Sequence, residues 1–274
     1  MIGIFDSGLG GLTVLKDIRS RLPQYDYLYL ADSARAPYGG HSKETITDFS
    51  RQAASWLFDH GCNLVIFACN TASSQALRTL QQEWLPSVDN DPNKPKRILG
   101  VVRPLVETAM EITRGRVGVL ATRATVESNA FVHELKKLRP DIVVHQNAAP
   151  LLVPLIEEGW IKRTVTRQIL KGYLRPLKDA NVDTLILGCT HYPLLLSLLR
   201  PLLPNSVTVL DAGSIVATKL ADYLKRHPEI ETQLTKTSTT KFYTTDDPKR
   251  FATQAGHWWG QTIQTERTAL QKAN

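Results

Sequence analysis

The sequence lacks the features that mark secreted, disulfide-rich or membrane-spanning proteins. Only three of its 274 residues are cysteines, and no two stand in a Cys-x-x-Cys spacing, so we expect free thiols in a reducing compartment. Met1 leads directly into an apolar segment with no basic region before it, and we therefore expect no signal peptide. The leucine-rich residues 194–203 are too few and too interrupted by proline to span a bilayer.

No charge run or low-complexity tract stands out either. Apolar residues make up 42% and charged residues 22% of the chain, which predicts an ordinary soluble protein with a real core. The length suits one large α/β domain or two modest ones. The net charge of +7 comes from lysines and arginines spread along the sequence. This pattern favours attraction of an anionic small molecule over nucleic-acid binding.

The segment DTLILGCTHYPLLLSLLRP, residues 183–201, is the centre of the sequence. An apolar run ends at Gly188, and a proline soon opens a leucine-rich segment. Between them lie three side chains that can exchange protons or hydrogen bonds: Cys189, Thr190 and His191. The pattern predicts a buried strand, a tight turn and a helix with proline in its first turn. A thiol placed there lies near the positive end of the helix dipole, which favours the thiolate.

A second copy of this pattern occurs earlier, in CNLVIFACNTASSQA, residues 62–76. Aligning Cys69 with Cys189 places Asn70 and Thr71 on Thr190 and His191. The segment IGIFDSG precedes the first motif as RVGVLAT precedes the second, and we align Asp6 with Thr122. We interpret the sequence as two related α/β halves whose strand ends share one cleft.

Strands alternate with helices along the whole chain, which predicts doubly wound, mainly parallel sheets. Ligands of such sheets bind at the carboxyl ends of the strands, where both cysteines lie. The GLGG of residues 8–11 is typical of an anion cradle at a helix start, and equally of a plain strand-to-helix turn. The loop APYGG at residues 36–40 carries Tyr38, which either faces solvent or closes over a substrate. Residues 86–97, rich in Pro, Asn and Asp, predict a linker and a domain boundary.

Two thiols, an acid and an imidazole at one cleft suit proton transfer. One thiol can remove a proton from a carbon while the other returns a proton to the opposite face, which inverts a stereocentre without a cofactor. Asp6 can orient or activate Cys69, and His191 can do so for Cys189. Four further side chains offer hydrogen bonds suited to carboxylate and ammonium groups: Ser7, Asn70, Thr71 and Thr190.

These motifs resemble those of the glutamate racemases, a family within the aspartate/glutamate racemase superfamily. The resemblance runs nearly end to end. It is carried by DSGLGGL (6–12), APYGG (36–40), ACNTAS (68–73), LATRATVES (120–128), LVPLIEEG (152–159), LILGCTHYPLL (185–195) and FYTTDDPKRF (242–251).

The resemblance implies cofactor-independent interconversion of L- and D-glutamate, with no metal, in the cytoplasm of a bacterium that uses D-glutamate for peptidoglycan. It implies that Cys69 deprotonates D-glutamate and Cys189 deprotonates L-glutamate, with Asp6 and His191 assisting. Asp32 and Glu157 match further acidic positions that can assist. The positions expected to hold the amino acid are Ser7, Pro37, Tyr38, Gly39, Asn70, Thr71, Thr122, Thr125 and Thr190.

The implied fold has two α/β domains, the C-terminal segment returning to the first. We therefore expect one domain from residues 1–97 with 208–274 and another from residues 98–207, in a homodimer. The chain departs from the family pattern at Arg103 and Ala124, neither of which matches a catalytic position. Cys62 is expected to be a packed core thiol.

Three alternatives remain open at this point. A sister racemase acting on aspartate, or another two-cysteine isomerase of the superfamily, shares the two cysteine motifs, although DSGLGGL with PYGG favours glutamate. Cys69, Cys189, His191 and Asp6 are residue types that also bind zinc, but their separation lacks the spacing of a zinc finger. A nucleic-acid binder is suggested by the positive charge alone.

Overall fold

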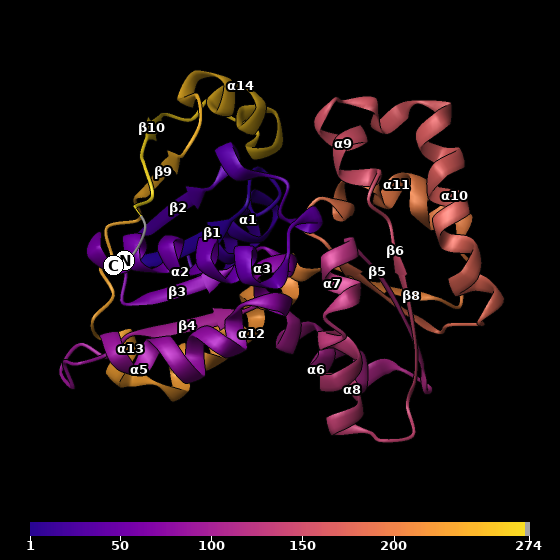
Figure 1. Cartoon of the computed structure of the whole chain (residues 1–274), viewed down its shortest axis with the longest axis horizontal. Helices are drawn as coiled ribbons and strands as arrows, with labels where there is room; N and C mark the ends of the chain where they lie inside the picture. Colours follow the sequence, from indigo (N-terminus) through magenta and orange to yellow (C-terminus); the bar gives the residue numbers. More distant parts are fainter. Residues whose placement is uncertain (272–274) are drawn as a thin grey trace.

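The computed structural model describes residues 1–271 and contains two β-sheets side by side, each covered by helices (Figure 1). Every strand pairing among these residues is parallel, which confirms the predicted fold class. The six-stranded first sheet has the order β10-β9-β2-β1-β3-β4. Its strands are β1 (Ile2–Asp6), β2 (Tyr27–Ala31), β3 (Leu64–Phe67), β4 (Arg97–Gly100), β9 (Thr240–Thr244) and β10 (Thr265–Arg267). The second sheet has the order β6-β5-β7-β8, from β5 (Arg116–Ala121), β6 (Val143–Ala148), β7 (Thr184–Gly188) and β8 (Thr208–Leu210).

Helices connect the strands in both halves of the chain. Those of the first sheet are α1 (Leu12–Arg21), α2 (Lys43–Asp59), α3 (Asn70–Gln75), α4 (Leu77–Thr79) and α5 (Leu85–Val88). Those around the second sheet are α6 (Val102–Ile112), α7 (Arg123–Glu127), α8 (Ala130–Leu138), α9 (Leu152–Glu157), α10 (Thr164–Asp179) and α11 (Leu196–Leu199). The returning segment forms α12 (Ala212–Arg226), α13 (Pro228–Glu231) and α14 (Pro248–Trp259). Short 3₁₀ or π turns are η1 (Ser33–Arg35), η2 (Tyr38–Gly40), η3 (Leu80–Trp84), η4 (Trp160–Lys162), η5 (Tyr192–Leu195) and η6 (Arg200–Leu202).

The duplication predicted from the two cysteine motifs is visible in the strand order. The orders β2-β1-β3-β4 and β6-β5-β7-β8 are the same when β1 is matched with β5 and β3 with β7. The register corrects one detail of the alignment. Phe5 pairs with Phe67, which lies two residues before Cys69. Leu120 pairs with Leu187, which lies two residues before Cys189. The equivalent of Thr122 is therefore Ser7 and not Asp6, so the buried acid has no counterpart in the second half.

The chain passes between the sheets three residues later than expected at both crossings. β4 pairs with β3 in the first sheet, although residues 98–100 were assigned to the second domain. β8 pairs with β7 in the second sheet, although residues 208–210 were assigned to the first. The linker composition of residues 86–97 marks only a surface turn before β4, and composition does not tell which sheet the next strand joins. We keep the division into two domains as a proposal, with the crossings placed after Gly100 and Leu210.

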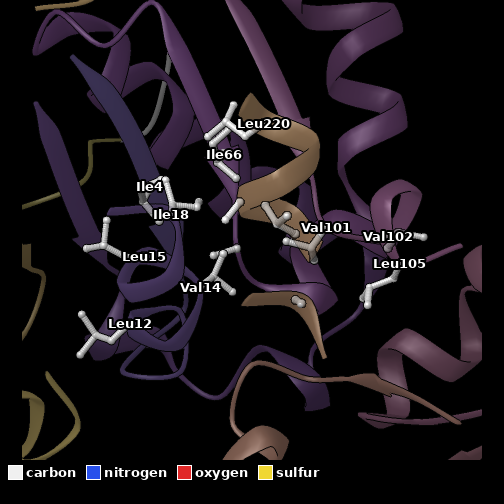
Figure 2. Close-up of a cluster of buried hydrophobic side chains, with 14 of the residues drawn as sticks. Ile4, Leu12, Val14, Leu15, Ile18, Ile66, Val101, Val102, Leu105 and Leu220 are labelled. Atoms are coloured by element: carbon white, nitrogen blue, oxygen red, sulfur yellow. The ribbon is translucent and has the colours of Figure 1, made fainter. Parts of the chain in front are cut away.

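A continuous buried cluster joins the two sheets on the side of α1, α6 and α12. Figure 2 shows Ile4 and Ile66 of the first sheet facing Ile18 of α1 and Leu220 of α12. The same cluster includes residues of the second sheet and of α6, such as Leu105. Burial of these side chains stabilises the arrangement by roughly 1.5–3 kcal/mol each. The two sheets are thus held together by apolar packing.

No helix within residues 1–271 combines the length and the apolar character needed to cross a membrane.

Candidate active site

The carboxyl ends of β1, β3, β5 and β7 surround a small cavity of about 30 Å³, enough for roughly two water molecules. Both cysteine motifs contribute to it, so the two thiols share one cavity, as the duplicated pattern predicts. The lining residues are Ser7, Gly8, Ala36, Pro37, Tyr38, Gly39, Cys69, Asn70, Thr71, Thr122, Val153, Glu157, Cys189, Thr190 and His191. Of the candidates proposed from sequence, Asp6, Asp32 and Thr125 do not line the cavity but lie behind residues that do.

Cys69 is the N-cap of α3, because its backbone is extended and its sulfur accepts a hydrogen bond from the Ala72 N–H at 3.5 Å. The thiol donates to Ser7 Oγ at 3.7 Å. Burial, and secondly the negative charge of Asp6, raise the pKa of Cys69 to about 12, against the smaller effect of the Ala72 N–H. From the sequence, a thiol near a helix start is expected to favour the thiolate; at Cys69 the removal of the thiol from water outweighs the helix and raises the pKa.

Asp6 lies at the end of β1 with its side chain fully buried. Its carboxylate accepts hydrogen bonds from the Gly8 N–H at 3.0 Å and from the Thr190 hydroxyl at 3.4 Å. Burial raises the pKa of Asp6 even though the His191 charge and these donors oppose the change. Asp6, at the end of the first strand, thus contacts the second cysteine motif through Thr190.

Cys189, His191 and Glu157 form a line of interacting groups. The Cys189 sulfur lies 3.9 Å from Nδ1 of His191, whose Nε2 lies 2.9 Å from Oε1 of Glu157. Burial lowers the pKa of His191, but the Cys189 sulfur and the Glu157 carboxylate outweigh it and raise that pKa to about 10. At neutral pH the ring is therefore an imidazolium, held between a sulfur and a carboxylate.

Three threonine hydroxyls meet where the two sheets face each other. Thr71 Oγ1 lies 2.9 Å from Thr122 Oγ1, which lies 2.9 Å from Thr125 Oγ1. Thr122 also caps α7, accepting a hydrogen bond from the Thr125 N–H at 3.3 Å. Because Thr71 belongs to the first cysteine motif and the other two to the second half, this cluster is a polar bridge across the cavity wall.

Asn70 is the clearest unsatisfied group at the site. It is 2% exposed, and neither its amide nitrogen nor its carbonyl oxygen has a hydrogen-bond partner among residues 1–271. Buried polar groups are almost always paired, and one left open at a cavity is available to a ligand. Its amide can donate to a carboxylate and accept from an ammonium group.

Another part of the cavity wall is formed by residues 36–39 of the APYGG loop. The Tyr38 ring is buried against Phe5 and Phe49, so it does not face solvent. Gly39 touches Thr122 of the second half so closely that a Cβ on this glycine would lie 2.9 Å from the Thr122 Cβ. Asp32 serves this loop from behind by accepting the Tyr38 hydroxyl.

Sequence reasoning missed several contacts. Gly8, Ala36 and Val153 line the cavity although only their motifs were singled out. Trp258 of α14 stands edge to face with His191, with ring centroids 5.4 Å apart. Nothing in the local sequence signals this contact, since it joins residues 67 positions apart through the returning segment.

Gly10→Ala is expected to lower activity by about tenfold to a hundredfold, the loss that a displacement near 1 Å brings at a catalytic site. A Cβ at this position would lie 2.1 Å from Thr190 Oγ1 and 2.5 Å from Nδ1 of His191. Gly172→Ala is the matched control, because a Cβ there meets nothing within 4 Å. Steady-state turnover of both purified variants checks the prediction, and a Gly10→Ala protein with the turnover of the unmodified protein contradicts it.

The zinc alternative receives no support from donor geometry. Within the described residues, no group of three or more His, Cys, Asp or Glu side chains is arranged to hold a metal ion.

The chain is similar to known racemases over most of its length. The Asp/Glu/hydantoin racemase family model matches residues 12–220. The glutamate racemase of Sulfurihydrogenibium sp. is 40% identical over 252 residues, covering 91% of this chain and 90% of the relative. The glutamate racemase structure from Bacillus anthracis has a TM-score of 0.89 at 32% identity and covers 98% of this chain and 97% of that one. The glutamate racemase of Francisella tularensis, solved with D-glutamate, has a TM-score of 0.86 at 34% identity, with 98% and 97% covered.

Proposed function

The chain belongs to the Asp/Glu/hydantoin racemase family as an amino-acid isomerase of the glutamate racemase type, and from this premise we propose that it interconverts L- and D-glutamate without a cofactor, using Cys69 and Cys189 as the two bases. The observation that carries the proposal is the pair of thiols at equivalent positions of two related halves, both lining one small cavity. Polarimetry on L-glutamate, with aspartate in parallel and no added cofactor, tests the activity and the choice of substrate.

The proposed reaction moves one proton on and one proton off the Cα atom. In the L-to-D direction, the Cys189 thiolate removes the Cα proton, and the Cys69 thiol delivers its own proton to the opposite face. The raised pKa of Cys69 supports its role as the protonated partner in the resting site. The His191 imidazolium faces the sulfur of Cys189 and balances a negative charge there. In the D-to-L direction the two thiols exchange roles, with Asp6 assisting Cys69.

The substrate is proposed to complete the charge balance of the cavity. An amino acid brings an ammonium group, and a positive charge near Cys69 and Asp6 favours their ionised forms. The open amide of Asn70 supports recognition of the α-carboxylate or the ammonium group. The remaining binding positions are proposed to be Ser7, Pro37, Tyr38, Gly39, Thr71, Thr122, Thr125 and Thr190, with Thr125 acting through Thr122.

Substrate entry requires the cavity to open. A volume of about 30 Å³ cannot contain glutamate, so the Thr71–Thr122 contact and the contact of Gly39 with Thr122 must separate as the halves move apart. Closure around the substrate then excludes water from the carbanion that proton removal creates.

The biological role that we propose is supply of D-glutamate for peptidoglycan in the bacterial cytoplasm, by a homodimer. Light scattering of the purified protein measures the oligomeric state.

Turnover of L-glutamate in D₂O is expected to place solvent deuterium on Cα of the D-product. The Cys69 thiol that reprotonates the carbanion has exchanged its hydrogen with solvent before the substrate binds. The reaction is stopped while most of the L-glutamate is still unreacted, so that few product molecules have reacted a second time. Mass spectrometry of the separated D-glutamate then measures its deuterium content. A D-product that keeps the substrate hydrogen contradicts the two-base mechanism.

A further inference from the structure

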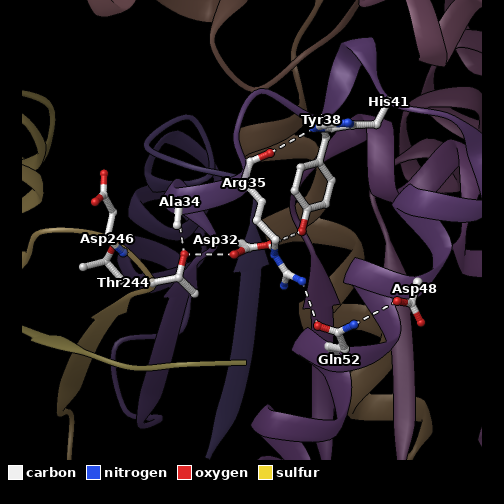
Figure 3. Close-up of polar contacts among 10 residues, drawn as sticks. Asp32, Ala34, Arg35, Tyr38, His41, Asp48, Gln52, Thr244 and Asp246 are labelled. Carbon is white, nitrogen blue, oxygen red and sulfur yellow. Dashed lines mark hydrogen bonds and ion pairs between the residues drawn. The ribbon is translucent and has the colours of Figure 1, made fainter. Parts of the chain in front are cut away.

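A buried polar network stands behind the loop that forms one wall of the cavity (Figure 3). Its centre is the carboxylate of Asp32, which is 0% exposed. Oδ2 accepts hydrogen bonds from the Tyr38 hydroxyl and, at 2.6 Å, from Nε of Arg35. Oδ1 accepts one from the Thr245 hydroxyl at 2.9 Å. Asp32 therefore holds Tyr38 from one side and is itself held by a residue more than 200 positions away.

Thr245 follows β9, the strand that the returning C-terminal segment adds beside β2. Its backbone N–H donates to the Ala31 carbonyl at 3.0 Å, which fixes the residue at the end of β2. Its hydroxyl accepts from the Ala34 N–H at 3.0 Å while donating to Asp32. One hydroxyl thus binds both the carboxylate and the backbone of the turn that leads into the cavity loop.

A second branch of the network runs through Arg35 to α2. The Arg35 guanidinium donates to Oε1 of Gln52 at 2.7 Å, and Nε2 of Gln52 donates to Asp48 at 2.9 Å. The guanidinium also lies 4.0 Å above the Phe49 ring. These contacts leave the carboxylate of Asp32 with one orientation.

The network ends at atoms that form the cavity. Tyr38 and the residues on either side of it line the cavity, whereas Asp32, Gln52 and Thr245 do not. Gly39 also meets Thr122 of the second half. Tyr38 and Gly39 thus link the network to the wall of the cavity and to its contact with the second half.

We propose that Thr245 is a positioning residue for substrate binding, which acts through Asp32 and Tyr38 to set the place of residues 37–39 in the cavity wall. Asp32 is then the centre of this positioning network and takes no part in proton transfer. The inference rests on the proposed racemase function and adds to it a role for the returning C-terminal strand.

Thr245→Val tests the proposal, because it keeps the shape of the side chain and removes the hydroxyl. We expect KM for L-glutamate to rise about threefold to tenfold, the size of the usual net contribution of one intramolecular hydrogen bond, with kcat changed less than about twofold. Thr245→Ser is expected to restore KM. The control is Thr240→Val on the same strand, whose hydroxyl has no partner among residues 1–271.

Tyr38→Phe removes the other hydroxyl that donates to Asp32 and supplies a second test of the network. Because both hydroxyls act through one carboxylate, the double variant is expected to raise KM by less than the product of the two single effects. An unchanged KM in Thr245→Val overturns the proposal whatever Tyr38→Phe shows, and so does full multiplication of the two effects. If Thr245→Val lowers the melting temperature but leaves KM unchanged, Thr245 contributes to stability alone, and this result also overturns the proposal. Turnover by the unmodified protein is measured first, since its absence refutes the racemase function and not the network.

Discussion

Cys69→Ser and Cys189→Ser are each expected to lose racemisation by at least about a thousandfold, within the range that a positioned acid or base contributes. A serine hydroxyl is far too weakly acidic to form the anion that removes a Cα proton, and it cannot replace a thiol as the matching proton donor. We expect that neither thiol can substitute for the other, because each comes from a different half of the chain, although both line one cavity. Polarimetry with L- and D-glutamate measures the loss in both directions.

Exchange of the Cα hydrogen with solvent distinguishes the loss of one base from a failure of the variant to fold. In Cys69→Ser the surviving Cys189 can still exchange the Cα hydrogen of L-glutamate with D₂O, and in Cys189→Ser the surviving Cys69 can still exchange that of D-glutamate. Each variant is therefore expected to label one enantiomer and not the other. The control is Cys62→Ala, since Cys62 is buried against Gly3 and Leu57, outside the cavity. Racemisation retained by either serine variant refutes the assignment of two thiol bases.

The architecture could be predicted because parallel α/β folds leave a strong local signature. Short apolar runs followed by helical segments identify strands such as β1, β3 and β7 without any information from distant residues. The pairing of strands depends on long-range contacts. For this reason β4 and β8 were assigned to the wrong halves, and the register between β1 and β3 was needed to match Ser7 with Thr122.

The position of the candidate site could be predicted from the duplicated cysteine motifs, because each motif follows the carboxyl end of a strand in its own parallel sheet, and ligands bind at such ends. Its electrostatics could not. The helix-start argument for Cys69 considered one local dipole, whereas burial by both halves of the chain decides the direction of its pKa. The contacts of Thr245 with Asp32 and of Trp258 with His191 likewise depend on how the C-terminal segment returns to the first sheet. The catalytic and binding roles of these residues remain predictions.

His191→Asn is expected to lower kcat for L-glutamate by about a hundredfold to a thousandfold, with a smaller change in KM. Nδ1 of His191 lies 3.9 Å from the Cys189 sulfur, and the raised pKa of this ring favours a positive charge beside the proposed thiolate. Asparagine keeps a hydrogen-bond donor near this place but has no charge. Kinetics in both directions measure the effect, and equal kcat values for variant and unmodified protein contradict the role of the imidazolium.

Glu157→Gln tests the same charge through its dependence on pH. The carboxylate, 2.9 Å from Nε2, helps to raise the pKa of His191 to about 10, so its loss must lower that pKa. The imidazolium is present below its pKa and disappears as the pH rises through it. The alkaline fall of kcat/KM for L-glutamate is therefore expected to begin at a lower pH in Glu157→Gln than in the unmodified protein. Glu158→Gln is the matched control, because this neighbouring acid is exposed and does not line the cavity. The prediction is contradicted if kcat/KM of Glu157→Gln falls at the same alkaline pH as that of the unmodified protein. It is also contradicted if the Glu158→Gln control shows the same shift.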